Sequence, residues 1–160
     1  LEEQDRSRWD QEQIAEGITL IQQAARMRRP GSYQLQAAIA AVHAEAEAPE
    51  QTDWSDIASL YNELLRLQPT PVVALNRAVA VAMAVGIDEG LALLDELAEQ
   101  ADLEGYYLLD SARADLLRRT GRSEEAATAY RRALATCEQP VERRYLERRL
   151  AEVSGRRAVQ

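Results

Sequence analysis

The sequence predicts an all-α fold, in which antiparallel helix hairpins stack as a tetratricopeptide-like right-handed solenoid of about eight helices. Two turn glycines, Gly86 and Gly121, stand 35 residues apart, close to the roughly 34-residue tetratricopeptide period. Apolar residues recur at helical spacing along the chain, and no strand pattern competes. Phenylalanine is absent and alanine is abundant, so the core is expected to consist of closely packed helices rather than sheets.

The helices of the first half are predicted from apolar stripes and from the residues that end them. A stripe that begins at Ile14 stops before Pro30, because proline cannot continue a helix. An alanine-rich helix follows, and residues 49–52 interrupt it. Asp53 or Ser55 can cap the next helix, which is strongly amphipathic.

In the second half, short connections at Gly86 and Gly121 are expected to make neighbouring helices antiparallel. The predicted helices span residues 14–29, 33–47, 54–68, 72–85, 89–99, 103–120, 123–137 and 141–153. We interpret 1–160 as a single domain, with 1–12 leading in from an upstream region and 139–160 forming a C-terminal capping helix and tail. The chain begins with Leu1 rather than methionine, which is typical of a piece of a longer protein.

Composition excludes several classes of function. The net charge of −8 argues against binding of a nucleic-acid backbone, although all 19 basic residues are arginine. The densest arginine run, 143–149, alternates with glutamates at helical spacing and predicts a salt-bridged solvent face. Cys137 is the only cysteine, so no internal disulfide is expected. No apolar run approaches the length of a membrane span, and we expect a cytoplasmic protein.

No catalytic or cofactor-binding constellation is predicted. His43 is the only histidine and has no partner at metal-ligand spacing, which favours a packed histidine over a ligand or catalyst. Gly86 and Gly90 flank a helix turn without the lysine and hydroxyl residue of a phosphate-binding loop. We therefore expect no enzymatic activity, no cofactor and no metal.

Aligning the repeats gives candidate binding residues. If Leu35 matches Leu75, then Gln36 falls on Asn76, and a one-residue slip places Asp110 beside them. First helices of stacked pairs line the concave face of a solenoid, so polar residues on them would face a bound segment. The candidates for such contact are Gln36, Asn76, Arg77, Asp110 and Arg113. The alternative is that Gln36 and Asn76 join adjacent helices or satisfy backbone groups.

Five blocks carry a more specific resemblance: DRSRWD at 5–10, YQLQAAIAAVHA at 33–44, TDW at 52–54, PVVALNRAVA at 71–80 and ARADLL at 112–117. Together they resemble the C-terminal extension of a group of bacterial extracytoplasmic-function RNA polymerase sigma factors. The resemblance implies a tetratricopeptide-like domain that follows two sigma domains and modulates transcription initiation. It implies contact with the sigma domains of the parent chain, core RNA polymerase or a regulatory protein, with DNA bound only through the parent chain.

The N-terminal segment is a second candidate interface, because it lies where this domain would join the sigma domains. Arg6, Arg8, Trp9 and Asp10 combine apolar area with arginine donors, as protein interfaces do. The alternative is that Trp9 packs into the core of its own domain. Two rival functions are a free-standing peptide-binding scaffold and a small-molecule sensor, for which His43 near Tyr33 is the best candidate site.

Overall fold

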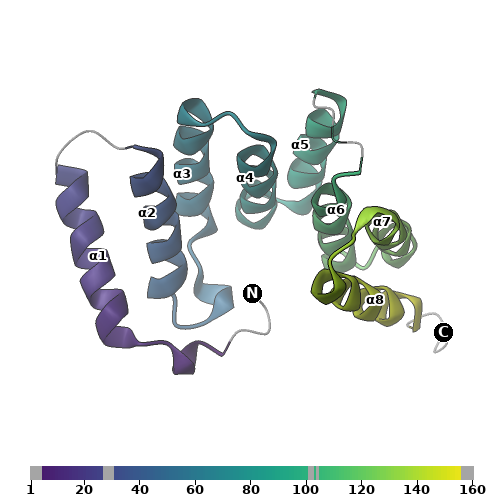
Figure 1. The fold of residues 1–160 in the computed structure, drawn as a ribbon, viewed down its shortest axis with the longest axis horizontal. Coiled ribbons are helices and arrows are strands. Elements are labelled where there is room, and N and C mark those ends of the chain that lie inside the picture. The colour runs from purple at the N-terminus through teal and green to yellow at the C-terminus, as the bar shows by residue number, and fades with distance from the viewer. Residues whose placement is uncertain (1–4, 27–30, 101–102, 104, 156–160) are drawn as a thin grey trace. The chain divides into compact units, whose positions relative to one another are not determined.

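The computed structural model describes residues 5–26, 31–100, 103 and 105–155, and these are all-helical (Figure 1). The α-helices are α1 (Gln11–Arg26), α2 (Ser32–Glu45), α3 (Trp54–Leu67), α4 (Pro71–Ala84), α5 (Ile87–Gln100), α6 (Tyr107–Arg119), α7 (Ser123–Thr136) and α8 (Pro140–Gly155). Two short 3-10 helices, η1 (Arg6–Arg8) and η2 (Pro49–Gln51), precede α1 and α3. The predicted all-α fold with eight helices is confirmed for the described residues.

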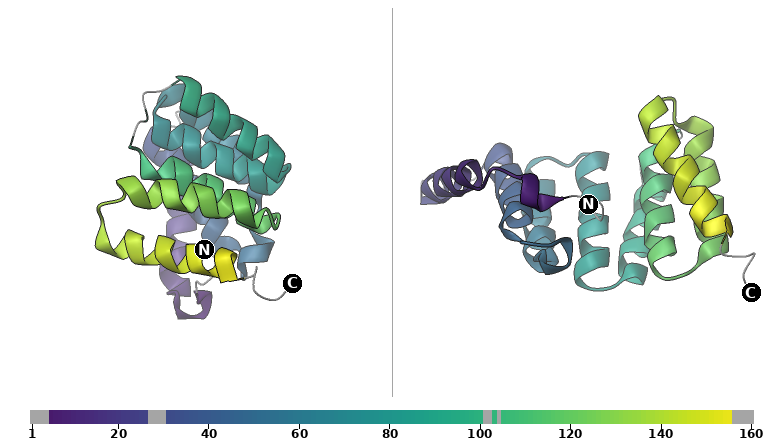
Figure 2. Two further views of the ribbon diagram at one scale, coloured as in Figure 1. Left: turned by 90° about the vertical axis from the view of Figure 1, so that its right-hand side faces the viewer. Right: turned by 90° about the horizontal axis from the view of Figure 1, so that it is seen from below.

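The chain divides into two compact units, Leu1–Ala80 and Val81–Gln160, with α4 running from the first into the second. In the first unit α1 packs on α2 and α2 on α3; in the second, α5, α6, α7 and α8 pack in chain order (Figure 2). This packing of consecutive helices is consistent with a helical solenoid. The right-handed superhelix stays a prediction.

Helix caps explain where the helices of the first unit begin. Asp10 caps α1, since its Oδ1 accepts hydrogen bonds from the backbone N–H groups of Glu12 and Gln13, each at 3.1 Å. Asp53 caps α3 by accepting from the N–H of Asp56 at 3.0 Å, as predicted. Both caps satisfy N–H groups that a helix leaves without partners in its first turn.

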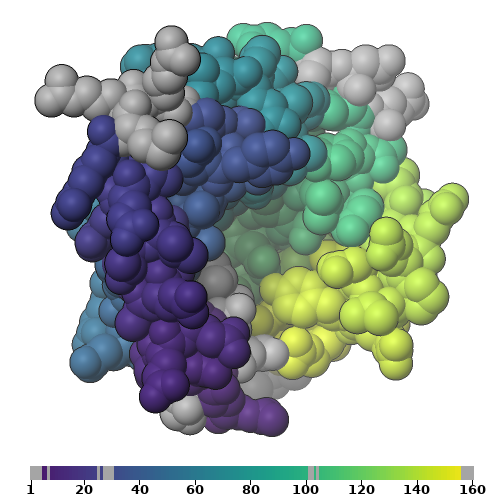
Figure 3. Space-filling view, turned by 60° about the vertical axis from the view of Figure 1, so that its left-hand side comes forward, coloured from purple at the N-terminus to yellow at the C-terminus, as the bar shows by residue number. Residues whose placement is uncertain are grey.

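The core of the first unit lies mainly between α2, α3 and α4. Ile39 of α2, Ile57 and Leu64 of α3, and Ala78 of α4 are all buried. The helix α1 forms an outer face of this unit (Figure 3) and buries its apolar stripe only partly against α2, with Ile14 half-buried. The most tightly packed part of the unit is therefore away from α1.

In the second unit, α6 and α7 approach each other most closely. Ala114 on α6 and Ala126 and Ala133 on α7 are completely buried, so small side chains stand where the backbones come together. Tyr130 and Leu146 are the large side chains that complete this core, at 0% and 1% exposure. The alanine-rich composition thus reflects close helix contact, as the sequence predicts.

The two turn glycines differ in conformation. Gly121 has a φ of +75° and ends α6, with its N–H donating to Arg118 and the N–H of Arg122 donating to Leu117, both at 3.1 Å. This is the Schellman arrangement, which glycine adopts without steric cost. Gly86 has no positive φ and instead opens α5, where its carbonyl accepts from the N–H of Gly90.

Several helix starts differ from the predicted ones, and two of the differences have a clear cause. The sixth helix begins at Tyr107 rather than Leu103, because Gly105 has a φ of +81° and the N–H of Tyr106 donates a hydrogen bond to the carbonyl oxygen of Leu103, which forms a turn. The fourth begins at Pro71 rather than Val72, since proline is suited to the first helical position, where an N–H would have no partner. The first helix begins at Gln11, three residues before the predicted start, and the remaining described ends lie within about two residues of the prediction, as is usual for helix termini. The predicted end of the first helix falls in 27–30, outside the described residues.

Replacing Gly121 should destabilise the second unit through backbone conformation alone, because no atom lies within 4 Å of the position that a Cβ would take. We expect Gly121→Ala to lower the free energy of unfolding by about 1–2 kcal/mol, and Gly121→Asn to lower it less, since asparagine tolerates the left-handed region. Chemical denaturation measures both. As a control, Gly17→Ala inside α1 should stabilise by about 0.5–1 kcal/mol; equal effects at the two glycines would contradict this account.

Candidate functional site

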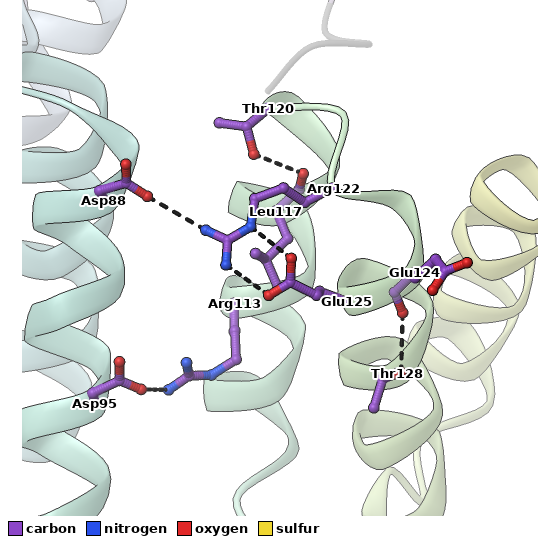
Figure 4. A network of polar contacts seen from close by, with 9 residues as sticks. All are labelled: Asp88, Asp95, Arg113, Leu117, Thr120, Arg122, Glu124, Glu125 and Thr128. Carbon is purple, nitrogen blue, oxygen red and sulfur yellow. Dashed lines mark hydrogen bonds and ion pairs between the residues drawn. The ribbon is translucent and has the colours of Figure 1, made fainter.

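The helices α5, α6 and α7 of the second unit line an open groove with a volume of about 580 Å³. The first and last of these helices form its walls, and α6 contributes residues between them (Figure 4). Its lining consists of Asp88, Leu91, Ala92, Asp95, Arg113, Leu117, Arg122, Glu124, Glu125, Thr128, Ala129 and Arg132. Because these residues recur every three or four positions along α5 and α7, each wall presents one helical face to the groove.

Two ion pairs cross the groove (Figure 4). Arg122, at the start of α7, reaches Asp88 on α5 with its Nη1, 3.3 Å from the carboxylate Oδ1. The same guanidinium binds Glu125 in a bidentate manner, at 2.8 Å from Nε and 2.6 Å from Nη2. About two turns further along α5, Asp95 pairs with Nη2 of Arg113 at 2.5 Å. The space between α5 and the α6–α7 hairpin is thus bridged by charged side chains.

The apolar lining of the groove is largely covered already. Leu91, Leu117 and Ala129 are only 7%, 4% and 3% exposed. The charged side chains above them are accessible, with the side chain of Asp88 88% exposed and that of Asp95 61% exposed. The surface that the groove offers to a binding partner is therefore mainly charged.

The contacts around the groove shift the pKa values of two carboxyl groups, those of Glu125 and Asp110. The hydrogen bonds from Arg122 lower the pKa of the Glu125 carboxyl, so this residue stays ionised in the pair. Burial raises the pKa of Asp110, and the guanidinium groups of Arg132 and Arg113 partly offset that rise. Asp110 is therefore within electrostatic range of two groove arginines.

Most of the polar residues that were predicted to form a ladder along the concave face, on the first helices, form hydrogen bonds to neighbouring helices. Gln36 donates from Nε2 to Gln68 at 3.3 Å, and Arg77 donates from Nε to Asn62 at 2.5 Å. Asn76 hydrogen-bonds to the side chain of Tyr61 on α3. These contacts correspond to the alternative reading, in which such residues join adjacent helices. Of the predicted binding residues, the groove includes only Arg113, with Asp110 close by; the predicted ladder along the first helices stays a prediction.

The N-terminal segment is attached to its own unit through Arg6, which is 7% exposed. Its guanidinium donates to the carbonyl oxygen of Ala46 at 2.6 Å and to the hydroxyl of Thr52 at 3.4 Å, and stacks over Trp9 at 5.2 Å. Asp10 serves as the helix cap described above. Among the four candidates in this segment, Arg8 is therefore the exposed one without such a structural role in the contacts described.

His43 packs against Trp54. The two rings meet edge to face with centroids 5.2 Å apart, and Nδ1 is buried without a hydrogen-bond partner among the described residues. Burial and, to a smaller extent, the Arg6 charge lower the pKa of His43. Ten residues along α2 separate His43 from Tyr33 by about 15 Å, and Tyr33 is 83% exposed. The small-molecule site at His43 stays a prediction.

A polar junction in the second unit was not predicted from the sequence. The carboxylate of Asp115 on α6 accepts hydrogen bonds from the hydroxyls of Tyr130 on α7, at 2.5 Å, and Tyr145 on α8, at 3.1 Å. Nε of Arg118 lies 3.5 Å away. Burial is the main reason that the pKa values of both tyrosines are raised. One carboxylate thus joins three helices, a contact that only the helix packing reveals.

The arginines of α8 have structural roles. Arg143 donates from Nη1 to the carbonyl oxygens of Leu134 and Cys137, at 2.7 and 2.8 Å, and so caps the end of α7. Arg149 is buried and pairs with Glu152 at 2.9 Å. The expected salt-bridged run is present, and part of it is directed inward.

The part of the chain that the structure describes contains no cluster of three histidine, cysteine or carboxylate residues able to hold a metal ion. Among the described helices, none combines the length and the hydrophobicity that a membrane span needs. Neither observation adds a site to the groove.

Removing one hydroxyl from the Asp115 junction should destabilise the second unit, because the carboxylate would lose a partner in a buried setting. We expect Tyr130→Phe to lower the free energy of unfolding by about 2 kcal/mol, the range for a hydrogen bond to a charged group. Tyr33→Phe, at an exposed tyrosine, is the matched control and should leave stability unchanged. Urea denaturation of both variants measures the difference, and equal stabilities would refute the junction.

The environment of His43 should make the stability of the first unit depend on pH. Its folded pKa is lowered, so the unfolded chain binds more protons, and the free energy of unfolding should fall as the pH drops below about 6.5 and level off once the folded form is also protonated. In His43→Gln this component should disappear. The free energy of unfolding is measured against pH for both proteins, and the difference between the two curves isolates the contribution of His43. If the unchanged chain became more stable relative to His43→Gln as the pH fell, the proposed cause would be excluded.

No protein family model matches the chain, and no solved structure matches it. The chain is similar to an uncharacterized protein of Rhizobium meliloti (strain 1021), with 48% identity over 155 residues. The match covers 97% of this chain and 36% of the relative, so the chain spans little more than a third of that protein's length. The sequence is therefore shared over almost its whole extent with one segment of a larger protein.

Proposed function

We propose that this chain is a regulatory protein-interaction domain of an extracytoplasmic-function sigma factor. In this proposal it modulates transcription initiation by contacting the sigma domains, core RNA polymerase or a regulatory partner. The observation that carries the interaction role is the open, charged groove of α5, α6 and α7, which suits a protein surface more than an enclosed small ligand. The link to transcription rests on the sequence resemblance.

The blocks that carry the resemblance lie mainly on the helical framework. Residues 33–44 belong to α2, 71–80 to α4 and 112–117 to α6. Several of their side chains are buried, among them Leu35, Ile39, Val73, Leu75, Ala114 and Leu116. The resemblance therefore supports a shared fold, and the partner is inferred from the role of that fold in the sigma-factor group.

Charge supports a protein rather than a nucleic-acid partner. The chain carries a net charge of −8, and the groove arginines Arg113 and Arg122 are already paired with carboxylates. Phosphate backbones require an excess of positive charge, whereas the groove lining as a whole holds four carboxylates and three arginines. The Rhizobium meliloti relative, most of which lies outside the match, is consistent with a domain that acts beside others in one chain.

A free-standing peptide-binding scaffold is the second candidate, because the same groove could bind a segment of an unrelated protein. Both functions would use the groove as the binding surface, and they differ only in the protein that binds there. Binding to sigma domains or core polymerase favours the regulatory proposal, whereas binding restricted to other peptides favours the scaffold.

Purified chain should bind sigma domains of the resembled group, or core RNA polymerase, saturably. Arg113→Ala, Asn76→Ala and Arg77→Ala test the predicted contact residues, with circular dichroism as the check on folding. The expected result is weaker binding by at least one folded variant in isothermal titration calorimetry. Absence of binding to either partner at about 100 μM, which corresponds to roughly −5.5 kcal/mol, would overturn the proposal.

A further inference from the structure

The groove has opposite charge at its two ends. At one end, where α5 and α7 begin, Asp88 and Glu125 both bind the single arginine Arg122, while the carboxylate of Glu124 points away from it (Figure 4). At the other end, Arg113 and Arg132 line the groove together with the single carboxylate Asp95. Counting the lining residues alone, acidic groups prevail at the first end and arginines at the second.

The ends are kept apart by helix geometry. Asp88 and Asp95 are seven residues apart on α5, which is about two turns or about 10 Å along the helix. The pairs Arg122–Asp88 and Arg113–Asp95 join these same positions to α7 and α6. Since one pair joins the two walls and the other joins α5 to α6, the polarity of the groove is built into the packing of the three helices.

Arg132 is the groove arginine best placed to meet a partner. Its side chain is exposed, and among the described residues it interacts only electrostatically, with the half-buried carboxylate of Asp110. Arg113 and Arg122, by contrast, already have carboxylate partners. An incoming carboxylate can therefore reach Arg132 without first breaking an ion pair.

We propose that this groove docks a charged protein segment that has basic side chains at one end and acidic side chains at the other. The basic end of the segment lies at Asp88 and Glu125, and its acidic end lies at Arg132 and Arg113. The walls are helical faces with side chains every three or four residues, into which the ridges of a short helix fit. This inference rests on the proposed function and names the chemistry of the partner segment.

Because the apolar lining is mostly covered, docking depends on charge. Exposed ion pairs are individually weak and are screened by salt, so we expect a reversible complex that weakens as ionic strength rises. Complementary potentials also select the orientation of the segment, since the reversed arrangement would place like charges together.

Two synthetic helical peptides of about four turns provide the test, and they have identical composition. In one, arginines occupy one end and glutamates the other; in the second, the same residues alternate along the chain. Fluorescence anisotropy with the 160-residue chain should show several-fold tighter binding of the first peptide at low salt. Equal affinities, or no saturable binding of either peptide, would overturn the proposal.

Matched variants locate the contact. Arg132→Glu should weaken binding of the first peptide by roughly fivefold, in line with the reversal of one exposed charge. Arg131→Glu changes the net charge equally at an exposed neighbour outside the groove, and should have little effect. At the acidic end, Asp88→Asn is compared with Glu89→Gln in the same way. If the paired variants were equally impaired, the attraction would be non-specific and the proposal would fail.

These outcomes are distinguishable from failure of the proposed function. The peptides report on the groove alone, whereas the assay with sigma domains and core polymerase reports on the identity of the partner. Selective peptide binding without sigma or polymerase binding would retain the groove and assign it to another protein.

Discussion

The close approach of α6 and α7 is the contact on which the second unit depends. Ala114, Ala126 and Ala133 are completely buried there, so the two backbones come together without an intervening large side chain. The Schellman turn at Gly121 reverses the chain within the few residues that this approach allows. As a result α6 and α7 form one surface, on which Arg113 and Arg132 are neighbours of Asp110.

Many polar side chains of this protein stabilise helix packing instead of facing a partner. Arg6 fastens the N-terminal segment to Ala46 and Thr52, and Arg143 caps α7. An arginine has five donors in a planar fork, so one side chain can satisfy several carbonyl groups where a helix ends. The abundance of arginine is therefore partly structural, and basic residues cannot be taken as a binding surface without their contacts.

Sequence patterns predicted the helices well, because each depends on local features: apolar periodicity, the Asp53 cap and the prolines between helices. They misplaced the start of α6, since nothing local distinguishes residues 103–106 from helix except the left-handed Gly105. They also missed the Asp115 junction, which requires Tyr130 and Tyr145 to arrive from two other helices. Such contacts join residues 15 and 30 positions apart, and spacing within one helix does not reveal them.

The same distinction between local and long-range contacts applies to the candidate site. Equivalent positions on first helices suggested a polar ladder, yet Gln36 and Arg77 bind neighbouring helices. The groove lining comes mostly from α5 and α7, the second helices of their hairpins. A partner that bound there would compete with the pairs Arg122–Asp88 and Arg113–Asp95 for their charges. The carboxylates of both pairs are exposed, with Asp88 at 88% and Asp95 at 61%. Since exposed ion pairs are weak, the groove can bind and release a charged segment without disturbing the alanine-packed core beneath it.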